Sequence, residues 1–444
     1  MTGSHKPQQQ ITKSQKTIIF GSWLGWSLDG YDLVLMLFII SSISQLFFPS
    51  KDPTLSLLAI FATYTVTLAM RPVGGALFGS FGDKHGRKKA MIITISGFST
   101  ATFLTGLLPT WQTVGILAPI LLILLRFAQG LFAGGEWASG AVITMETAPK
   151  SMHGFLSGFV QSGYTYGFLI ASIVFQIMLS AYPGNSFVSE GGWRIMFYTG
   201  IIPGLITIFV GFKMNESKLW LKRLEQKNTD GSLRKGKGSP LREIVGGKEA
   251  RKRFLLALIV MTGLMYAYYT TMGFMPTFLQ KYLNIEKREA ATIMIAATIS
   301  SLIGTIFAGF ISQYIGRMTT LTLFALAAII LAIPILNGLH DSTTLTQRMF
   351  FTALLVFVAS TAFGPMPAFL SERFPTTIRN SASGFAYNGG LIIGSWSPLV
   401  ATQLLSQAHS QFIPYALAIN IMIGSIIVFI GSRLNPDTRG TDLD

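Results

Sequence analysis

Long apolar segments alternate with short polar ones along the whole chain. Each apolar run spans roughly 20 residues, which lets an α-helix cross about 30 Å of hydrocarbon. The runs are continuously apolar instead of alternating with polar residues, and this pattern predicts membrane helices and excludes a transmembrane β-barrel. We therefore predict an all-α membrane protein with twelve spanning helices, near Thr17–Phe47, Leu55–Ser80, Ala90–Leu108, Val114–Thr147, Gly154–Ala181, Trp193–Phe212, Phe254–Leu279, Ala290–Ser312, Leu321–Leu336, Met349–Ser371, Ser383–Leu405 and Phe412–Ile430.

One long polar stretch, residues 213–252, separates the first six apolar runs from the last six. It contains NTDGSLRKGKGSP, a Gly-, Ser- and Lys-rich sequence with little to bury, and this composition predicts a cytosolic linker. The preceding KLWLKRLEQK suits either an amphipathic helix on the membrane surface or a solvated linker. The predicted organisation is a cytosolic tail at 1–16, a six-helix bundle at 17–212, the linker at 213–252, a second six-helix bundle at 253–434 and a cytosolic tail at 435–444.

The two sets of six runs contain matching sequences. GSFGDKHGR at 79–87 is echoed by GFISQYIGR at 309–317, an offset of 230 residues. ETAP at 146–149 is echoed by ERFP at 372–375, an offset of 226 residues. Two unrelated matches at almost the same offset indicate a duplicated six-helix unit, which is one of the known plans of membrane transporters.

Composition and charge agree with a membrane protein. The 444 residues are 50% hydrophobic and 12% charged, about half the charged fraction of an ordinary soluble protein. The net charge of +15 comes from basic residues placed between the apolar runs, as the positive-inside rule requires, so we expect no nucleic-acid partner. The distribution of Lys and Arg places both termini in the cytosol, and no cleaved signal peptide is predicted. We expect a monomeric, multi-pass protein of the cell (inner) membrane, whose partners are the bilayer and a small molecule.

The sequence carries no pattern typical of an enzyme or of a metal protein. It contains no cysteine, and its five histidines lack metal-ligand spacing. A Walker lysine motif is absent, so ATP drive is not supported. We expect no catalytic residues, no metal and no cofactor apart from a proton as the coupling ion.

Acids inside the predicted helices are the first candidates for chemistry, because charges in hydrocarbon are costly and face a cavity or a partner. Asp29 and Asp32 stand three residues apart in the first helix and share one face. Burial and mutual repulsion favour proton uptake by at least one of them. Glu136, in the glycine-rich sequence AGGEWASG, is a further proton-site candidate. Alternatively, these acids only hold helices together through polar contacts.

The remaining polar candidates inside the predicted helices of the first half are Arg71, Arg126 and Gln129. Arg126, Gln129 and Glu136 lie on one side of the fourth helix. Arg71 stands eight residues before Gly79, roughly 12 Å inside the membrane. It either pairs with an acid such as Asp29 or Glu136, or meets an anionic substrate.

The second half places no charge in its helix centres. Its polar content is aromatic and amide, so we expect it to clamp the substrate through hydrogen bonds and ring faces. In YAYYTTMGFMP, Gly273 and Pro276 should interrupt the seventh helix and form a moving gate. The predicted substrate-binding residues of the two halves are Arg71, Arg126, Gln129, Gln161, Tyr164, Tyr269, Tyr387 and Asn388.

The motif GSFGDKHGRKK at 79–89 resembles the loop 2–3 signature of the major facilitator superfamily. Its surroundings, RPVGGALFGSFGDKHGRKKAM, APILLILLRFAQGLFAGGEWASGA and GGWR, are similar to the metabolite:proton symporter family, whereas LDGYDLVL is more similar to the sialate and aromatic-acid:proton symporters. The resemblance implies that Asp32 is the proton-coupling aspartate of the first helix and that Arg126 pairs with it. For the cytosolic gate we predict Gly79, Asp83, Gly86, Arg87, Gly316 and Arg317.

We therefore expect a proton-coupled symporter that imports a small carboxylate-bearing metabolite by alternating access. Asp29, Asp32, Glu136 and Arg126 would carry the proton coupling. The alternative is a symporter of betaine- or proline-type zwitterions, in which rings such as Trp26 and Tyr269 cage a quaternary ammonium group. A third reading is a non-transporting sensor on the same fold.

Overall fold

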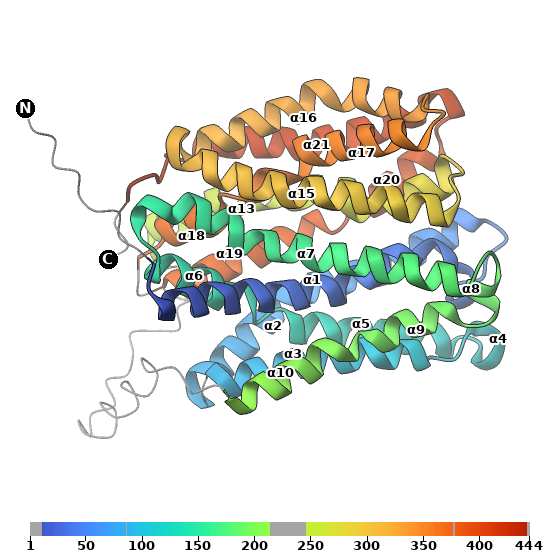
Figure 1. Cartoon of the computed structure of the whole chain (residues 1–444), viewed down its shortest axis with the longest axis horizontal. Helices are drawn as coiled ribbons and strands as arrows, with labels where there is room; N and C mark the ends of the chain where they lie inside the picture. Colours follow the sequence, from blue (N-terminus) through green and yellow to red (C-terminus); the bar gives the residue numbers. More distant parts are fainter. Residues whose placement is uncertain (1–10, 86, 214–245, 376–377, 442–444) are drawn as a thin grey trace, which may run out of the picture.

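The computed structural model describes residues 11–85, 87–213, 246–375 and 378–441. In this part of the chain the regular structure is helical, and long helices pack side by side (Figure 1). The first half contains α1 (Lys13–Phe47), α2 (Pro53–His85), α3 (Arg87–Leu107), α5 (Leu117–Ala133) continued by α6 (Trp137–Thr147), α7 (His153–Ala181), and α9 (Gly192–Thr199) continued by α10 (Ile201–Lys213). The connections hold α4 (Trp111–Val114), η1 (Lys150–Met152) and α8 (Ser186–Ser189).

The second half repeats this plan. It contains α13 (Lys248–Tyr268) continued by η2 (Tyr269–Gly273), α14 (Met275–Thr277) and η3 (Phe278–Tyr282); α15 (Lys287–Ile315); α16 (Arg317–His340); α17 (Leu345–Ser360) continued by η4 (Thr361–Phe363) and α18 (Met366–Arg373); α19 (Arg379–Gly394) continued by α20 (Ser397–Ser406); η5 (Ser410–Phe412); and α21 (Ile413–Leu434). α1 begins and α21 ends at the same end of the molecule (Figure 1).

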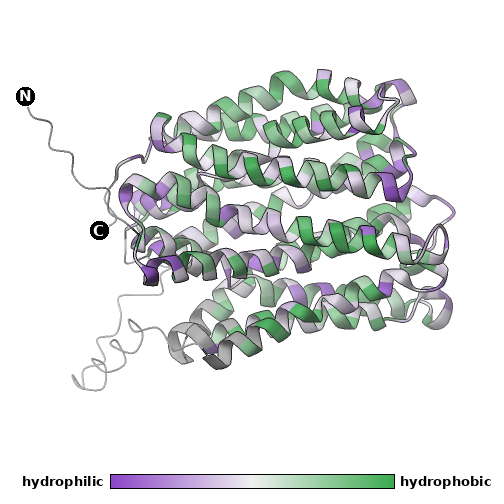
Figure 2. Cartoon of the chain, in the orientation of Figure 1, coloured by the Kyte–Doolittle hydropathy of each residue, from purple (hydrophilic) through white to green (hydrophobic). Residues whose placement is uncertain are grey.

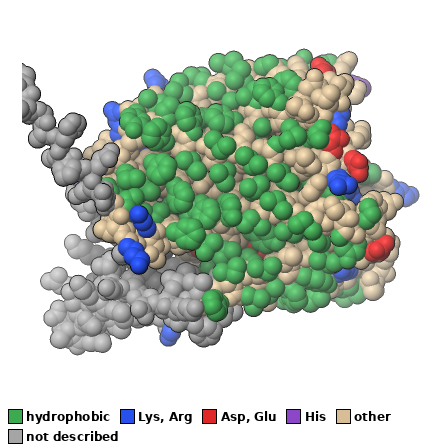
Figure 3. All heavy atoms as spheres, in the orientation of Figure 1, with side chains coloured by type: hydrophobic (Ala, Val, Ile, Leu, Met, Phe, Trp, Pro, Cys, Tyr) green, Lys and Arg blue, Asp and Glu red, His purple; other side chains and the backbone are tan. Residues whose placement is uncertain are grey.

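The outer surface of the helices is suited to lipid. Eight helical segments in the described residues are long and apolar enough to cross a membrane, and the shorter or interrupted α3, α5–α6, α9–α10 and α19–α20 complete the twelve. Apolar side chains cover the middle of the visible face, and charged ones gather towards its two ends (Figures 2 and 3). The predicted all-α fold of twelve helices in two bundles is confirmed. The predicted linker lies mostly outside the described residues.

The two halves meet most closely where α7 packs against α15 (Figure 1). Two glycines make this approach possible. A Cβ at Gly309 would lie 2.5 Å from the Cα of Gly158, and a Cβ at Gly158 would lie 2.8 Å from the carbonyl oxygen of Thr305. Only glycine lets the two backbones touch at this distance.

Several spanning segments are irregular at positions that matter for the site. Pro72 lies inside α2 directly after Arg71, where its missing N–H removes a helical hydrogen bond. α13 passes into the π-helical turn η2 near Gly273, so the predicted interruption of this helix is confirmed. The fourth spanning segment breaks between Ala133 and Trp137, a break that sequence analysis did not predict.

Candidate transport site

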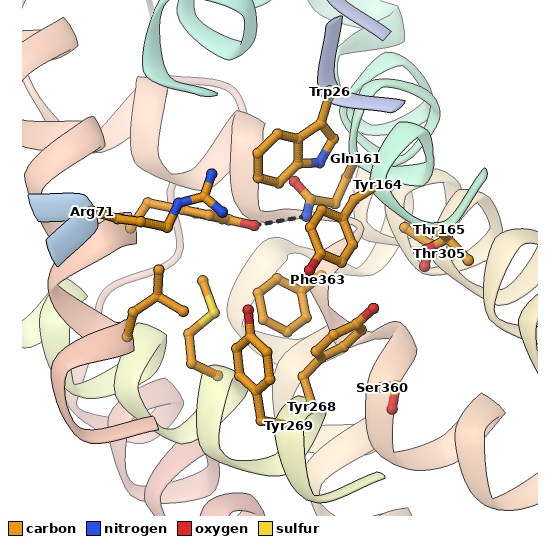
Figure 4. A pocket seen from close by; sticks show the side chains of 13 residues that line it. Trp26, Arg71, Gln161, Tyr164, Thr165, Tyr268, Tyr269, Thr305, Ser360 and Phe363 are labelled. Atoms are coloured by element: carbon orange, nitrogen blue, oxygen red, sulfur yellow. Dashed lines mark hydrogen bonds between the residues drawn. The ribbon is translucent and has the colours of Figure 1, made fainter. Parts of the chain in front are cut away.

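A cavity lies between the two halves, and both of them line it (Figure 4). The empty space between its walls, counted together with the part open to solvent, is about 440 Å³. Among the lining residues in the described part of the chain, Arg71 is the only charged side chain. The walls are formed by Trp26, Arg71, Gln161, Tyr164 and Thr165 of the first half, and by Met265, Tyr268, Tyr269, Thr305, Ser360, Phe363, Tyr387 and Leu391 of the second.

Five of these side chains form a closed circuit of aromatic rings, which we call the aromatic cage. The first half contributes two of the rings and the second half three. Successive ring centroids are separated by 5.1 Å for Trp26 and Tyr164, 5.9 Å for Tyr164 and Tyr268, 5.6 Å for Tyr268 and Phe363, 6.3 Å for Phe363 and Tyr387, and 5.9 Å for Tyr387 and Trp26.

Polar contacts hold one ring of the cage in place. Tyr387 stacks on Trp137 with centroids 3.7 Å apart. Gln161 donates to the Tyr387 hydroxyl at 3.1 Å and accepts from Trp137 Nε1 at 3.3 Å. Because Tyr387 belongs to α19 and its two partners belong to the first half, the cage is assembled only when the halves are together.

Arg71 enters the cavity from α2, next to the cage (Figure 4). Its Nη2 donates to Asp29 Oδ2 at 2.5 Å and to the carbonyl oxygen of Ala133 at 3.2 Å. Both members of this ion pair are almost fully buried. The guanidinium carbon lies 5.8 Å from the centroid of the Trp26 ring. Of the partners expected for Arg71, Asp29 is therefore the one that the structure provides.

Glu136 stands at the break between α5 and α6. It occupies the N-cap position of α6 but makes no capping hydrogen bond. Its Oε2 is buried without a hydrogen-bond partner among the described residues. Its Oε1 faces α1, where a Cβ at Gly25 would lie 2.7 Å away. An ionised carboxylate without a donor is strongly disfavoured in such a place, so this geometry suits the protonated acid.

Asp32 and Arg126 lie within the first half, outside the cavity wall. Asp32 Oδ2 accepts from Gln129 Nε2 at 2.7 Å, and the same amide donates to Thr102 at 2.7 Å. Arg126 Nη2 donates to Thr105 at 2.5 Å, while its Nε and Nη1 are buried without a partner in the described chain. No hydrogen bond joins Arg126 to Asp32 in the described residues: Thr105 and Gln129 each bind one of their polar atoms, and Asp32 Oδ1 is left without a partner.

The predicted substrate-binding residues divide into two groups. Arg71, Gln161, Tyr164, Tyr269 and Tyr387 line the cavity. The other three do not line it: Arg126 and Gln129 are fully buried behind the wall, and Asn388 donates to the carbonyl oxygens of Gly134 at 3.3 Å and Gly384 at 3.1 Å.

Sequence analysis missed Phe363, although a signal was present. Phe363 lies in TAFGPMP, where α17 passes through η4 into α18. Glycine and proline interrupt this helix as they do the seventh. An interrupted helix that faces a cavity is a common place for ligand contacts in transporters.

At one end of the molecule, Glu372 of α18 joins the two halves. It accepts from Arg317 at 2.9 and 3.3 Å and from Thr438 at 2.7 Å, all within the second half. Its Oε1 also lies 3.5 Å from Nδ1 of His153, which belongs to α7 of the first half. Gly316, with φ +101°, starts α16 and positions Arg317. The predicted gate residues Gly316 and Arg317 thus lie beside a link between the halves.

A second ion pair at this end relates to the first by the internal repeat. Glu146 of α6 accepts from Arg379 of α19 at 2.8 Å. Glu146 and Glu372 differ by 226 residues, and so do His153 and Arg379. The two cross-links are therefore repeat copies, with histidine in one and arginine in the other. Part of the gate predicted at 79–87 lies outside what the structure describes. This holds for Gly86, for the surroundings of Gly79, and for the side chains of Asp83 and Arg87.

Comparison with known proteins identifies the family. The family model described as Major Facilitator Superfamily matches residues 19–398. The chain is 30% identical over 423 residues to the glycine betaine/proline/ectoine/pipecolic acid transporter OusA of Dickeya dadantii, covering 94% of this chain and 83% of the relative. It is also 30% identical over 423 residues to the proline/betaine transporter of Escherichia coli K12, covering 93% and 82%.

Solved structures agree on the fold. The proton:xylose symporter XylE, bound to 6-bromo-6-deoxy-D-glucose, matches with a TM-score of 0.74 at 18% identity and covers 97% of each chain. A partially occluded inward-open form of XylE from E. coli matches with a TM-score of 0.72 at 18% identity, covering 97% of this chain and 100% of that chain. The relatives in sequence are named as transporters of glycine betaine, proline and other metabolites rather than as enzymes. With a family match over most of its length and relatives at 30% identity, this chain is a transporter of the major facilitator superfamily.

Proposed function

We propose that this transporter is a proton-coupled symporter of a small zwitterion, of the betaine or proline type, that carries one carboxylate and one substituted ammonium group. The observation that carries this proposal is the aromatic cage next to Arg71. A cage of rings and a guanidinium group side by side provide one site for each end of such a molecule. Import of a simple organic acid is the second candidate, favoured by Arg71 alone.

The dimensions of the cage suit a cation. Five rings with centroids 5.1–6.3 Å apart would each lie roughly 5 Å from the centre of a regular pentagon, within the ~6 Å reach of a cation–π contact. A desolvated cation gains about 2 kcal/mol from such a contact. A quaternary ammonium group needs no hydrogen-bond acceptor, so ring faces alone can replace its water.

Charge balance favours a zwitterion over a simple carboxylate. Arg71 is already neutralised by Asp29, so a lone anion would bring an uncompensated charge into a low-dielectric site. The negative faces of the aromatic rings would repel it further. A zwitterion adds no net charge, and its ammonium group occupies the rings while its carboxylate meets Arg71.

The relatives in sequence, the distribution of basic residues and the buried acids support the proposed inner-membrane location, orientation and proton coupling. Two relatives are named as transporters of betaine and proline, and a third, 29% identical over 405 residues, is an inner membrane metabolite transport protein of E. coli K12. We place both termini in the cytosol, because the end that holds the start of α1 and the end of α21 also carries Lys13, Lys16, Lys89, Arg317, Arg379 and Arg433. Buried Asp29, Asp32 and Glu136 supply candidates for proton coupling.

Transport by the purified protein tests the proposal. Proteoliposomes with an inward proton gradient would be given labelled glycine betaine, proline, shikimate or succinate, with and without an uncoupler. We expect uncoupler-sensitive accumulation of the zwitterions above the acids. Accumulation of the acids alone would support the second candidate, and accumulation that resists the uncoupler would contradict proton coupling.

A further inference from the structure

The cavity has a second polar end, away from Arg71. Figure 4 shows Arg71 on one side and Thr165, Thr305 and Ser360 on the other, with rings of the aromatic cage between them. We call these three hydroxyl residues the hydroxyl end. None of them carries a charge, so they offer no counterion to a carboxylate and suit a neutral hydrogen-bonding group instead.

Thr165 of α7 and Thr305 of α15 leave their hydroxyl groups unused by the protein. A threonine inside a helix can donate to a carbonyl oxygen of the preceding turn, as Thr298 does to Met294 at 2.6 Å. Within the described residues no hydrogen bond engages the hydroxyl group of Thr165 or Thr305, although these residues are only 4% and 2% exposed. Buried polar groups normally have a partner, and the content of the cavity is what remains to supply one.

The close packing of α7 on α15 brings the two threonines together. Gly154 packs on Gly309, and Gly158 packs on Thr305, so the two helices run in opposite directions. Thr165 lies about two turns beyond Gly158, and Thr305 lies about one turn before Gly309. Both threonines therefore stand on the same side of the glycine contact, and one hydroxyl group comes from each half of the protein.

Ser360, at the end of α17, faces the cavity as a hydrogen-bond acceptor. Its hydroxyl group contacts that of Thr271. Thr271 has a single O–H, which it donates to the carbonyl oxygen of Ala267 at 2.8 Å, so the proton between the two hydroxyl groups comes from Ser360. A ligand group that meets Ser360 must therefore donate. A hydroxyl group can donate to Ser360 and accept from a threonine at once, whereas a carboxylate, carbonyl or ether only accepts.

We propose that the substrate is a zwitterion with a hydroxyl group on the far side of its ammonium group, and that Thr165, Thr305 and Ser360 bind this hydroxyl group. The inference rests on the proposed function, which places the carboxylate at Arg71 and the ammonium group in the aromatic cage. Tyr268 belongs to the cage and also borders the hydroxyl end. Its hydroxyl group has no partner in the described residues and points towards Thr165 and Thr305 in Figure 4.

A simple betaine leaves the hydroxyl end without a partner from the ligand. The ammonium group of glycine betaine carries only methyl groups beyond its carboxylate arm, so water must occupy this end of the cavity. A site that hydrogen-bonds a substrate hydroxyl group disfavours the analogue that lacks it, because polar groups of the site are then left unpaired. Glycine betaine should therefore bind, but less tightly than a zwitterion that reaches the hydroxyl end.

A matched pair of ligands tests the proposal on the wild-type protein. N-(2-hydroxyethyl)-N,N-dimethylglycine has a carboxylate on one side of its ammonium group and a hydroxyl group on the other, and N-propyl-N,N-dimethylglycine has a methyl group in place of that hydroxyl. The affinity of each for the detergent-solubilised whole chain is measured by calorimetry. We expect the hydroxyethyl ligand to bind about tenfold more tightly. Equal affinities, or tighter binding of the propyl ligand, would overturn the proposal.

Valine substitutions then locate the effect. Thr165→Val and Thr305→Val keep the shape of the side chain but remove its hydroxyl group, and together they should abolish the preference for the hydroxyethyl ligand. Thr298→Val is the matched control and should keep the preference, because Thr298 is on the same helix as Thr305 but bonds to its own backbone and does not line the cavity. A preference that persists in the double variant, or an equal loss of affinity for both ligands, would contradict the assignment.

Two further outcomes are kept apart. If the double variant does not fold, each single valine variant should reduce the preference, and an unchanged preference in both would overturn the proposal. Failure of the wild type to bind either ligand or glycine betaine would instead refute the proposed function. Binding of both ligands with equal affinity would leave the proposed function in place and remove only the hydroxyl end.

Discussion

The two walls of the cavity are built from different chemistry. The first half supplies Arg71, and the acids Asp29 and Glu136 stand behind it. The second half supplies rings and hydroxyl groups, and none of its described lining residues is charged. The difference teaches that the charged side chains belong to one bundle, whereas the aromatic cage is shared by both. Proton coupling and substrate choice should therefore respond to different mutations.

Arg71→Gln should have the largest effect. It removes the anchor of the carboxylate and leaves Asp29 buried without a charged partner. We expect binding of glycine betaine to weaken about 100-fold, equivalent to about 3 kcal/mol. The measurement is calorimetric affinity, repeated with choline, which has the same ammonium group but no carboxylate. An equal loss of choline binding would show that the whole site had collapsed. It would contradict the claim that Arg71 binds only the carboxylate end of the substrate.

The ion pairs of Glu372 and Glu146, at the end of the molecule where α1 begins, allow a comparison between the halves. Glu372→Gln leaves the guanidinium group of Arg317 buried with no anion, and should destabilise the protein by about 3 kcal/mol. Glu146→Gln, at the partly exposed copy, should cost at most about 1 kcal/mol. Thermal unfolding in detergent would measure both. Equal shifts in Tm would mean that Glu372 and Glu146 contribute equally to stability, contrary to this prediction.

Tyr268→Leu tests the aromatic wall. The substitution keeps apolar bulk but removes one ring of the cage, and should weaken glycine betaine binding about tenfold through loss of about 1.4 kcal/mol of cation–π attraction. The pH dependence of affinity should stay unchanged. Tyr268→Phe is the matched control, since the hydroxyl has no hydrogen-bond partner in the described residues. A loss of the same size in Tyr268→Phe would assign recognition to the hydroxyl group.

The smallest effect is expected for His153→Arg. In the wild type both ring nitrogens face acceptors, Nδ1 towards Glu372 at 3.5 Å and Nε2 towards the carbonyl oxygen of Ala148 at 3.2 Å. Neutral imidazole has a single N–H and can satisfy only one of them. Arginine, the residue at the repeat position, offers more donors than imidazole and should hold the Glu372 carboxylate more firmly. Hydrogen exchange of α18 amides at one fixed pH would then be slower than in the wild type; an unchanged rate would contradict this role.

Much of the fold was predictable because hydrocarbon imposes one rule on the backbone. Continuous apolar runs must be helical, so the spanning segments followed from length alone. Arg71 was recognisable because a guanidinium group that deep needs a partner. The aromatic cage was harder to predict from the sequence, since the rotation of α13 about its axis decides whether Tyr266, Tyr268 or Tyr269 faces the cavity. The hydrogen bonds of Gln129 to Asp32 and of Arg126 to Thr105 could not be predicted, because neutral side chains give no charge pattern to follow.

The contact between Gly158 and Gly309 has a consequence for leakage. Under the proposed function, solute that the cell has accumulated flows back whenever the carrier opens without its proton. Two backbones in direct contact leave no layer of side chains to yield gradually, so the seam between α7 and α15 is either shut or parted. The lack of a side chain at Gly158 and Gly309 thus affects how long an accumulated solute stays inside the cell.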